Sequence, residues 1–198
     1  MSFSKRYLEV AKQIIDSIDT SAIEKMVQVL KKIRDEEGRL FFIGSGGGAG
    51  HASHATCDFR KLCGFEAYCP TDNVSELSAR INDEGWDLSI ANYLKVSRIN
   101  SKDCLFVFSV GGGNEEKNIS TNLVNAVKLA KEVGAKVISI VGRDGGYAAK
   151  NSDVSIIIPT IDPSLITALT ESFQAMIWHL LVSHPDLQVN LPKWESTK

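Results

Sequence analysis

Two pairs of titratable residues have the spacing of one helix face. His54 and Asp58 are four residues apart, and Glu171 and His179 are eight apart, close to two helical turns. If the two helices meet, two imidazoles and two carboxylates converge, a donor set that suits tetrahedral Zn²⁺. Each residue also has a structural alternative. His179 lies in an apolar segment, where histidines are commonly satisfied core residues, and Asp58 has basic neighbours to pair with.

A glycine-rich loop precedes the first pair. Residues 40–58, LFFIGSGGGAGHASHATCD, read as an apolar strand, a loop of glycine and serine, and a helix. Backbone N–H groups free of side chains can close around a phosphate, whereas a simple turn without ligand does not need three consecutive glycines. The residues expected to face a substrate are Ser45, Gly46, Gly47, Gly48 and His51. For His51, a metal ligand or a proton shuttle is the alternative role.

The same loop loosely fits the fingerprint of dinucleotide-binding proteins. That fingerprint also requires an acidic residue at the end of the second strand, about 20 residues further on. Glu66 begins the expected second strand and Asp72 follows Pro70, so neither has the required position. We therefore expect no nicotinamide cofactor.

A second glycine-rich segment follows another apolar strand, CLFVF. It offers a hydroxyl, an amide and bare backbone before an expected helix, which are the features of an anion site. We expect the substrate phosphate at Ser109, Val110, Gly111, Gly112, Gly113 and Asn114. Two such loops on one sheet suit a phosphorylated small molecule whose hydroxyls the first loop would hold. Asn82 and Asp83, just before Gly85, are expected to cap a helix or to bind sugar hydroxyls.

Strand-like and helix-like runs alternate from residue 39 onward. The expected strands are 39–43, 66–69, 104–108, 136–141 and 154–158, and the expected helices are 50–62, 74–81, 87–96, 119–133 and 163–182. Continuous apolar strands indicate a sheet covered on both faces, and the alternation indicates a parallel, doubly wound order. Such α/β sheets bind ligands beyond the carboxyl ends of their strands, where the glycine-rich loops are expected.

Two segments with helical periodicity precede the first strand. Residues 8–18 and 23–33 carry apolar side chains at helical spacing, and Ser21 with Glu24 predicts a capping box for the second helix. Because these helices have no obvious place in an α/β sandwich, we expect them to pack against another subunit. One domain, 1–198, is expected, with N-terminal helices over 1–37, an α/β core over 38–184 and an irregular tail over 185–198.

Composition bears on the partners and the location of the chain. Of 198 residues, 43% are hydrophobic and 23% charged, and a net charge of −2 leaves no basic excess for nucleic acid. No apolar run is expected to reach the length of a membrane span, and the charged N-terminus does not read as a signal peptide. The four cysteines form no C-x-x-C pair. We expect free thiols and a cytoplasmic protein without nucleic-acid or membrane partners.

The motifs together resemble the sugar isomerase (SIS) domain family, and within it the phosphoheptose isomerases, which interconvert sedoheptulose 7-phosphate and a heptose 7-phosphate. Four motifs of the family, in chain order, are G-N-G-G-S, I-A-N-D-x-G, S-T-S-G-N-S and T-G-R-D-G-G. At the corresponding positions this chain has GSGGG, RINDEG, SVGGGN and VGRDGG, in the same order. The family's His and Glu after the first loop correspond to His54 and Asp58. Its Gln and His on the final helix correspond to Glu171 and His179.

The resemblance implies a flavodoxin-like three-layer sandwich and a homotetramer with active sites between subunits. It also implies a metal, often zinc, held by His54, Asp58, Glu171 and His179. The chain departs from the family at several of these positions. Asp58 replaces Glu and retracts the carboxylate, Glu171 replaces Gln and adds a charge, and Val110 and Gly111 remove two hydroxyls.

The predicted activity is aldose–ketose isomerisation of a phosphorylated sugar, sedoheptulose 7-phosphate to heptose 7-phosphate, through an enediol. Asp58 or Glu171 would be the base and His179 the acid, with Zn²⁺ polarising the carbonyl. The alternative is a non-catalytic SIS module that binds a phosphosugar or a protein partner for regulation. The missing glutamate and hydroxyls favour this alternative, and the retained four-residue set disfavours it.

Overall fold

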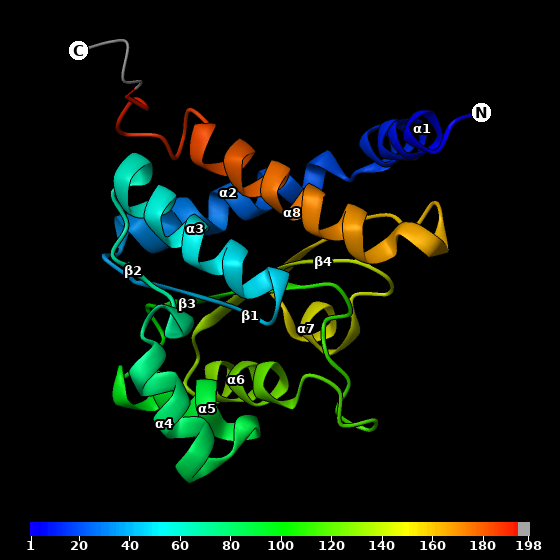
Figure 1. Ribbon diagram of the computed structural model, residues 1–198. Helices are drawn as coiled ribbons and strands as arrows, with labels where there is room; N and C mark the ends of the chain where they lie inside the picture. The colour runs from blue at the N-terminus through cyan, green and yellow to red at the C-terminus, as the bar shows by residue number, and fades with distance from the viewer. Residues whose placement is uncertain (194–198) are drawn as a thin grey trace.

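The computed structural model describes residues 1–193, which form a parallel sheet between two layers of helices (Figure 1). The strands are β1 (Leu40–Gly44), β2 (Ala67–Tyr68), β3 (Cys104–Ser109), β4 (Lys136–Val141) and β5 (Val154–Ile157). Their order is β2-β1-β3-β4-β5, and every neighbouring pair is parallel. The predicted α/β class and five-stranded parallel sheet are confirmed. The strand order reverses between β1 and β3, so their carboxyl ends open the crevice where such sheets bind ligands.

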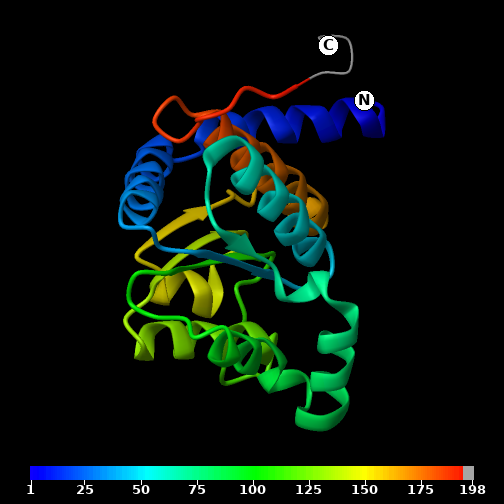
Figure 2. The same cartoon turned by 90° about the vertical axis from the view of Figure 1, so that its left-hand side faces the viewer.

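The helices divide between the two faces of the sheet (Figures 1 and 2). One face carries α1 (Phe3–Ser17), α2 (Thr20–Asp35), α3 (Gly47–Cys63) and α8 (Ile166–Ser183), and the other carries α5 (Ser89–Val96), α6 (Thr121–Glu132) and α7 (Gly146–Asn151). Strand side chains alternate between the layers: Phe42 and Phe106 face the first, and Phe41 and Leu105 face the second. The remaining helix, α4 (Val74–Glu84), buries none of its side chains.

The two N-terminal helices differ in how they join the fold. Contrary to expectation, α2 has a place in the sandwich, because Met26 and Leu30 are fully buried in the core shared with the sheet. On α1, Val10 and Ile14 are buried, while apolar side chains such as Leu8 and Ile15 remain exposed. Of these two helices, it is therefore α1 that keeps an apolar surface of the kind expected for contact with another subunit.

The start of α2 corrects the predicted capping box. The N-cap is Asp19, whose carboxylate accepts hydrogen bonds from the backbone N–H groups of Ser21 and Ala22. The predicted pairing of Ser21 with Glu24 is wrong, because the helix begins at Thr20 and Ser21 already lies inside it.

Several element boundaries also differ from the prediction, most of all around glycine. The start of α3 is Gly47 rather than residue 50, because Gly48 lets the first helical turn approach β3 closely. A Cβ on Gly48 would lie 2.6 Å from the carbonyl oxygen of Phe108. The short helix α7 was missed, since its glycine-rich start indicated a loop.

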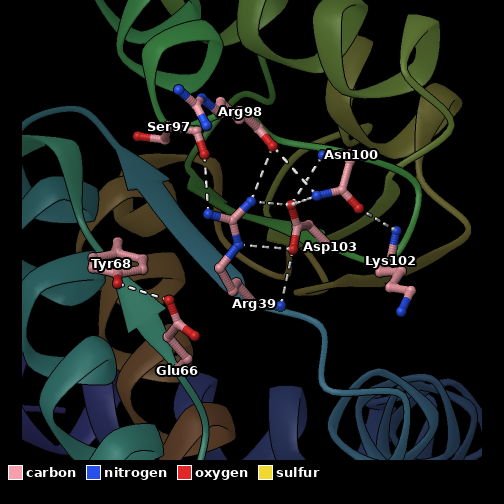
Figure 3. A network of polar contacts seen from close by, with 8 residues as sticks. All are labelled: Arg39, Glu66, Tyr68, Ser97, Arg98, Asn100, Lys102 and Asp103. Atoms are coloured by element: carbon pink, nitrogen blue, oxygen red, sulfur yellow. Dashed lines mark hydrogen bonds and ion pairs between the residues drawn. The ribbon is translucent and has the colours of Figure 1, made fainter.

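A buried ion pair joins the amino ends of β1 and β3, at the edge opposite the glycine-rich loops (Figure 3). The Asp103 side chain is 2% exposed and accepts hydrogen bonds from the backbone and guanidinium of Arg39 and from Asn100. Arg39 also donates to the carbonyl oxygens of Ser97 and Arg98. Pairing with Asp103 raises the pKa of Arg39. This network holds the two central strands in register away from the site.

The last helix and the tail complete the description. Contrary to the expected absence of such a run, Pro163–Ser183 is long and apolar enough to cross a membrane, judged by length and composition alone. Here Phe173 and Ile177 of α8 are buried in the core, as in the core helix of a soluble protein. All four cysteines are free, as predicted. The expected irregular tail over 185–198 lies partly outside the described residues, which end at 193.

Candidate metal centre and substrate loops

The two helices α3 and α8 lie side by side and bring two rows of polar residues together (Figure 2). The contacts follow the same order along both helices. Glu171 meets the first turn of α3, Gln174 meets His51, and Trp178 meets Asp58. The helices are therefore parallel, and residues far apart in sequence form one continuous row.

Three of the four predicted metal ligands form a compact group in this row. The Nε2 atoms of His54 and His179 each lie 3.5 Å from Oδ2 of Asp58. One ligand atom from each residue lies within 4.8 Å of the others. Around a tetrahedral zinc ion with bonds of about 2.0–2.1 Å, ligand atoms are about 3.4 Å apart, so this spacing fits zinc. Three protein ligands with a further open position are typical of catalytic rather than structural zinc sites.

Neighbouring groups orient two of these three side chains. The Nδ1 of His179 lies 2.8 Å from the carbonyl oxygen of Ala175, so the ring donates there and its Nε2 is left either to donate to Asp58 when protonated or to bind a metal through its lone pair. The Trp178 indole donates to Oδ2 of Asp58 at 3.3 Å. Burial raises the pKa of Cys63, at the end of α3, to about 12, which keeps this thiol protonated and unsuited to metal binding.

The fourth predicted ligand, Glu171, is not part of this group in residues 1–193. Its carboxyl group lies against the first turn of α3, 2.5 Å from the position that a Cβ on Gly47 would take. Glu171 and His179 do share a face of α8, but eight residues correspond to about 12 Å of helix, so they reach different partners. A carboxylate at the amino end of α3 also disfavours phosphate in the first loop.

His51 occupies the middle of the row without joining the metal group. Gln174 is fully buried and donates from Nε2 to the carbonyl oxygen of Ile140, so its Oε1 faces Nδ1 of His51 at 2.9 Å. His51 must therefore donate from Nδ1, and its Nε2 is the ring nitrogen left to face a substrate. The centroid of the ring lies 5.0 Å from that of Trp178. The chain thus supplies an imidazole of fixed orientation between Glu171 and the metal group.

The first loop holds a buried polar atom that lacks a partner. Asn122, at the start of α6, is fully buried and donates to the hydroxyl of Ser45 at 3.3 Å. Its Oδ1 has no hydrogen-bond partner within the described residues. A buried unpaired acceptor costs about 1–3 kcal/mol, so a ligand hydroxyl that donated to it would be favoured. Among the other loop residues expected to face substrate, Gly46 and Gly47 are exposed and Gly48 is buried.

The second loop is followed by a turn before α6. A bridge between Asn114 and Ile119 closes this turn, and α6 begins at Thr121, two residues after the predicted start of the helix at residue 119. Within the loop, the backbone N–H of Gly112 donates to the Ser109 hydroxyl at 3.0 Å. That hydroxyl keeps its own proton for a ligand. The backbone groups of Val110, Gly111 and Gly113 complete the predicted phosphate loop.

The remaining predicted residues lie apart from the row. Asn82 and Asp83 are exposed on α4, where the Asn82 amide donates to the Asp83 carboxylate at 2.7 Å. No contact within the described part of this chain joins them to the metal group.

Sequence reasoning missed three neutral members of the site, because it searched for titratable residues. Gln174 and Trp178 lie three and seven residues after Glu171, which is the spacing of one helix face and a usable signal. Asn122 had no such signal, because its partner Ser45 is distant in sequence.

Comparison with known proteins identifies the family. The sequence model of the SIS domain family matches residues 4–142 of this chain. The lincomycin biosynthesis protein LmbN of Streptomyces lincolnensis is 35% identical over 154 residues, 74% of this chain, and the aligned region spans 56% of that relative. A phosphoheptose isomerase of Aliarcobacter butzleri is 28% identical over 192 residues, 93% of each chain. The structure of a phosphoheptose isomerase from Neisseria gonorrhoeae is similar with a TM-score of 0.76 and 26% identity, over 90% of this chain and 94% of that one. The chain therefore belongs to the SIS domain family.

Proposed function

We propose that this protein is a zinc-dependent phosphosugar aldose–ketose isomerase whose substrate is sedoheptulose 7-phosphate or a close relative. The observation that carries the proposal is the group of His54, Asp58 and His179, whose atoms have the spacing of zinc ligands. Similarity to phosphoheptose isomerases over most of both chains supports the reaction class.

The metal would be held by Nε2 of His54, Oδ2 of Asp58 and Nε2 of His179. When bound there, zinc supplies a Lewis acid that polarises a carbonyl oxygen and stabilises the negative charge developing on it. The buried indole of Trp178 keeps the Asp58 carboxylate oriented by its hydrogen bond. The two imidazoles are more than half exposed, so a substrate oxygen can approach from solvent.

Glu171 is the better of the two candidate bases. Asp58 is engaged by two imidazoles and an indole, whereas the carboxylate of Glu171 stands apart at the first loop. With its side chain turned along α8 toward the metal group, Glu171 would remove the proton next to the carbonyl, and the C–H electron pair would form the double bond of an enediol. The same carboxyl group would return the proton to the neighbouring carbon.

In the same reaction a proton must move from the substrate hydroxyl next to the carbonyl to the carbonyl oxygen. His179 was the expected acid, but its Nε2 faces Asp58 and its Nδ1 proton is bonded to Ala175. We assign this transfer to His51, whose Nδ1 is held by Gln174 and whose Nε2 can accept the proton and give it back. Ser45 and Asn122 would bind sugar hydroxyls, and the loop from Ser109 to Asn114 would bind the phosphate.

A homo-oligomer, with a tetramer as the expected size, completes the proposal. Exposed apolar side chains on α1 and the unburied helix α4 favour contacts with further copies. Such contacts would be needed to bring Asn82 and Asp83 to a substrate. The four free thiols, three of them buried, favour the reducing cytoplasm as the location.

The test is ketose–aldose conversion of sedoheptulose 7-phosphate, followed by NMR with and without Zn²⁺. The Glu171→Ala variant should lower kcat by about 100- to 10,000-fold, the contribution typical of a general base. Ser172→Ala, on the same helix and exposed, is the matched control and should keep full activity. Absence of turnover by the unaltered protein with a panel of sugar phosphates would contradict the proposal.

A regulatory binding module is the second candidate, favoured by the missing hydroxyls at Val110 and Gly111 in the phosphate loop. It predicts saturable binding of a sugar phosphate without turnover. Calorimetry on the same panel, beside the NMR assay, separates the two functions.

A further inference from the structure

The chain that follows α8 turns back onto the carboxyl end of α3 (Figure 1). His184 ends α8, and its Nδ1 accepts a hydrogen bond from the backbone N–H of Asp186 at 3.1 Å, which closes a turn. Leu187 is fully buried in the core. The backbone N–H groups of Val189 and Asn190 then both donate to one carbonyl oxygen of α3. We call residues 184–190 the C-terminal strap.

The strap supplies partners for the end of α3. The last carbonyl groups of a helix have no partner within the helix itself. Here the carbonyl oxygen of Leu62 accepts from the two strap N–H groups, at 2.8 and 3.0 Å. That of Lys61 accepts from Nδ2 of Asn190 at 2.9 Å, and that of Cys63 accepts from Arg34 of α2 at 3.4 Å. The last three carbonyl oxygens of α3 are therefore all bound by groups outside the helix.

Arg34 holds the strap from the other side. Besides its bond to α3, its guanidinium donates to the carbonyl oxygens of Leu187 and Asp186, at 2.6 and 2.9 Å. The amide of Gln28, also on α2, donates to the Asp186 carboxylate at 3.2 Å. A cation at the carboxyl end of a helix is favourable, so Arg34 stabilises this end of α3 as well. The strap is thus fixed to two helices at once.

These contacts connect the two helices that carry the metal group. His179 lies on α8, five residues before the strap begins. Asp58 lies on α3, one turn before the carbonyl group that the strap binds. Beyond the strap, Leu191 and Lys193 line a cavity of about 320 Å³ together with Asp58. One continuous segment therefore joins the carboxyl ends of both ligand-bearing helices and passes beside the metal group.

We propose that the C-terminal strap holds α3 and α8 at the separation that zinc binding requires, with Asn190 as a positioning residue. The role of the strap rests on the zinc centre of the proposed function. Asn190 is not among the metal ligands and acts through the carbonyl oxygen of Lys61, about one turn from Asp58. Ligands that are held within about 0.5 Å of their bound positions lose less conformational freedom on binding, so they bind the ion more tightly. Because such coupling is reciprocal, zinc in turn should stabilise the docked strap.

The test compares two asparagines that make the same hydrogen bond at different places. Asn190→Ala removes the amide that binds α3 and keeps the two backbone N–H donors of the strap. Asn151→Ala is the matched control, because the Asn151 amide donates to the carbonyl oxygen of Tyr147, also at 2.9 Å, in α7 on the other face of the sheet. In chelator competition at pH 7, zinc affinity should fall about two- to tenfold for Asn190→Ala, the range that one neutral hydrogen bond contributes, and stay unchanged for Asn151→Ala.

Hydrogen exchange supplies a second readout, which a merely structural role of the strap would not change. In the unaltered chain, the backbone N–H groups of Val189 and Asn190 should exchange at least about twofold more slowly at saturating zinc than without zinc. The backbone N–H of Ala148 in α7, which is also hydrogen-bonded, should exchange equally fast in both conditions.

The possible failures separate this proposal from the proposed function. An unchanged zinc affinity of Asn190→Ala, an equal loss in Asn151→Ala, or exchange at Val189 that does not depend on zinc would each overturn the role of the strap and leave the zinc centre in place. If the unaltered chain binds no zinc, the zinc centre and the role of the strap are both overturned.

Discussion

Replacing Trp178 with phenylalanine should weaken zinc binding without removing a metal ligand. The indole donates to Oδ2 of Asp58 at 3.3 Å, and phenylalanine keeps an aromatic ring in the same buried position. A hydrogen bond to a charged group contributes about 1.5–3 kcal/mol, which corresponds to about 10- to 150-fold in affinity. The expected loss lies in the range found for groups that orient metal ligands.

The assay is competition for zinc with a chelator of known affinity at pH 7. Ile177→Val is the matched control, because Ile177 is the preceding residue, is equally buried and has no polar side-chain atom. It should lower stability by about 0.5–1.5 kcal/mol and leave zinc affinity unchanged. If Trp178→Phe binds zinc as tightly as the unaltered chain, or if Ile177→Val loses as much affinity, the hydrogen bond does not orient the ligand.

Three further predictions concern stability. Asp103→Ala should lower the free energy of unfolding by about 3–5 kcal/mol, because it leaves a partly buried guanidinium unpaired. In a thermal melt, Tm should fall by roughly 6–20 °C. A shift of only a degree or two would contradict the importance of the network in Figure 3. Hydrogen bonds from Ser164 and from an arginine of α1 lower the pKa of Asp162 from 3.8 to about 2. Their contribution is present above about pH 4 and is lost as pH falls toward 2. The protection of α1 against amide exchange, taken relative to an unstructured peptide at the same pH, should therefore fall over that range, and Asp162→Asn should abolish the dependence. Gly112→Ala should cost at least about 3 kcal/mol in urea unfolding, because its φ is +68° and a Cβ would lie 1.9 Å from a backbone oxygen. Gly46→Ala should lower the free energy of unfolding by only about 1–2 kcal/mol, because φ is +58° but a Cβ there would meet nothing within 4 Å. Equal losses of stability in the two variants would refute this reasoning.

The sheet was predictable because its strands are continuous apolar runs. The bounds of β4 match the prediction residue for residue, since a strand buried on both faces has few polar interruptions. Glycine was the main source of error. Glycine occurs in loops, at helix starts that pack closely against a strand, and in turns with positive φ. Which of these a given glycine adopts depends on the residues that pack against it in the fold.

The candidate site was predictable in part. Helical spacing correctly indicated that His54 and Asp58 share a face, and the family resemblance indicated that His179 faces them. Spacing could not indicate how far each side chain reaches, so Glu171 was expected at the metal although its carboxylate lies at the first loop. The turn between Asn114 and Ile119 was equally hidden, because its bridge depends on long-range placement of the loop.

The parallel packing of α3 and α8 has a consequence for insertions and deletions. Each residue added to a helix rotates everything beyond it by about 100°, so one extra residue between Glu171 and His179 would turn His179 away from Asp58. An insertion in the connection before α8, between β5 and Pro163, would leave the whole row intact. A change in the length of that connection therefore does not disturb the row, whereas the interval from 171 to 179 must keep its length.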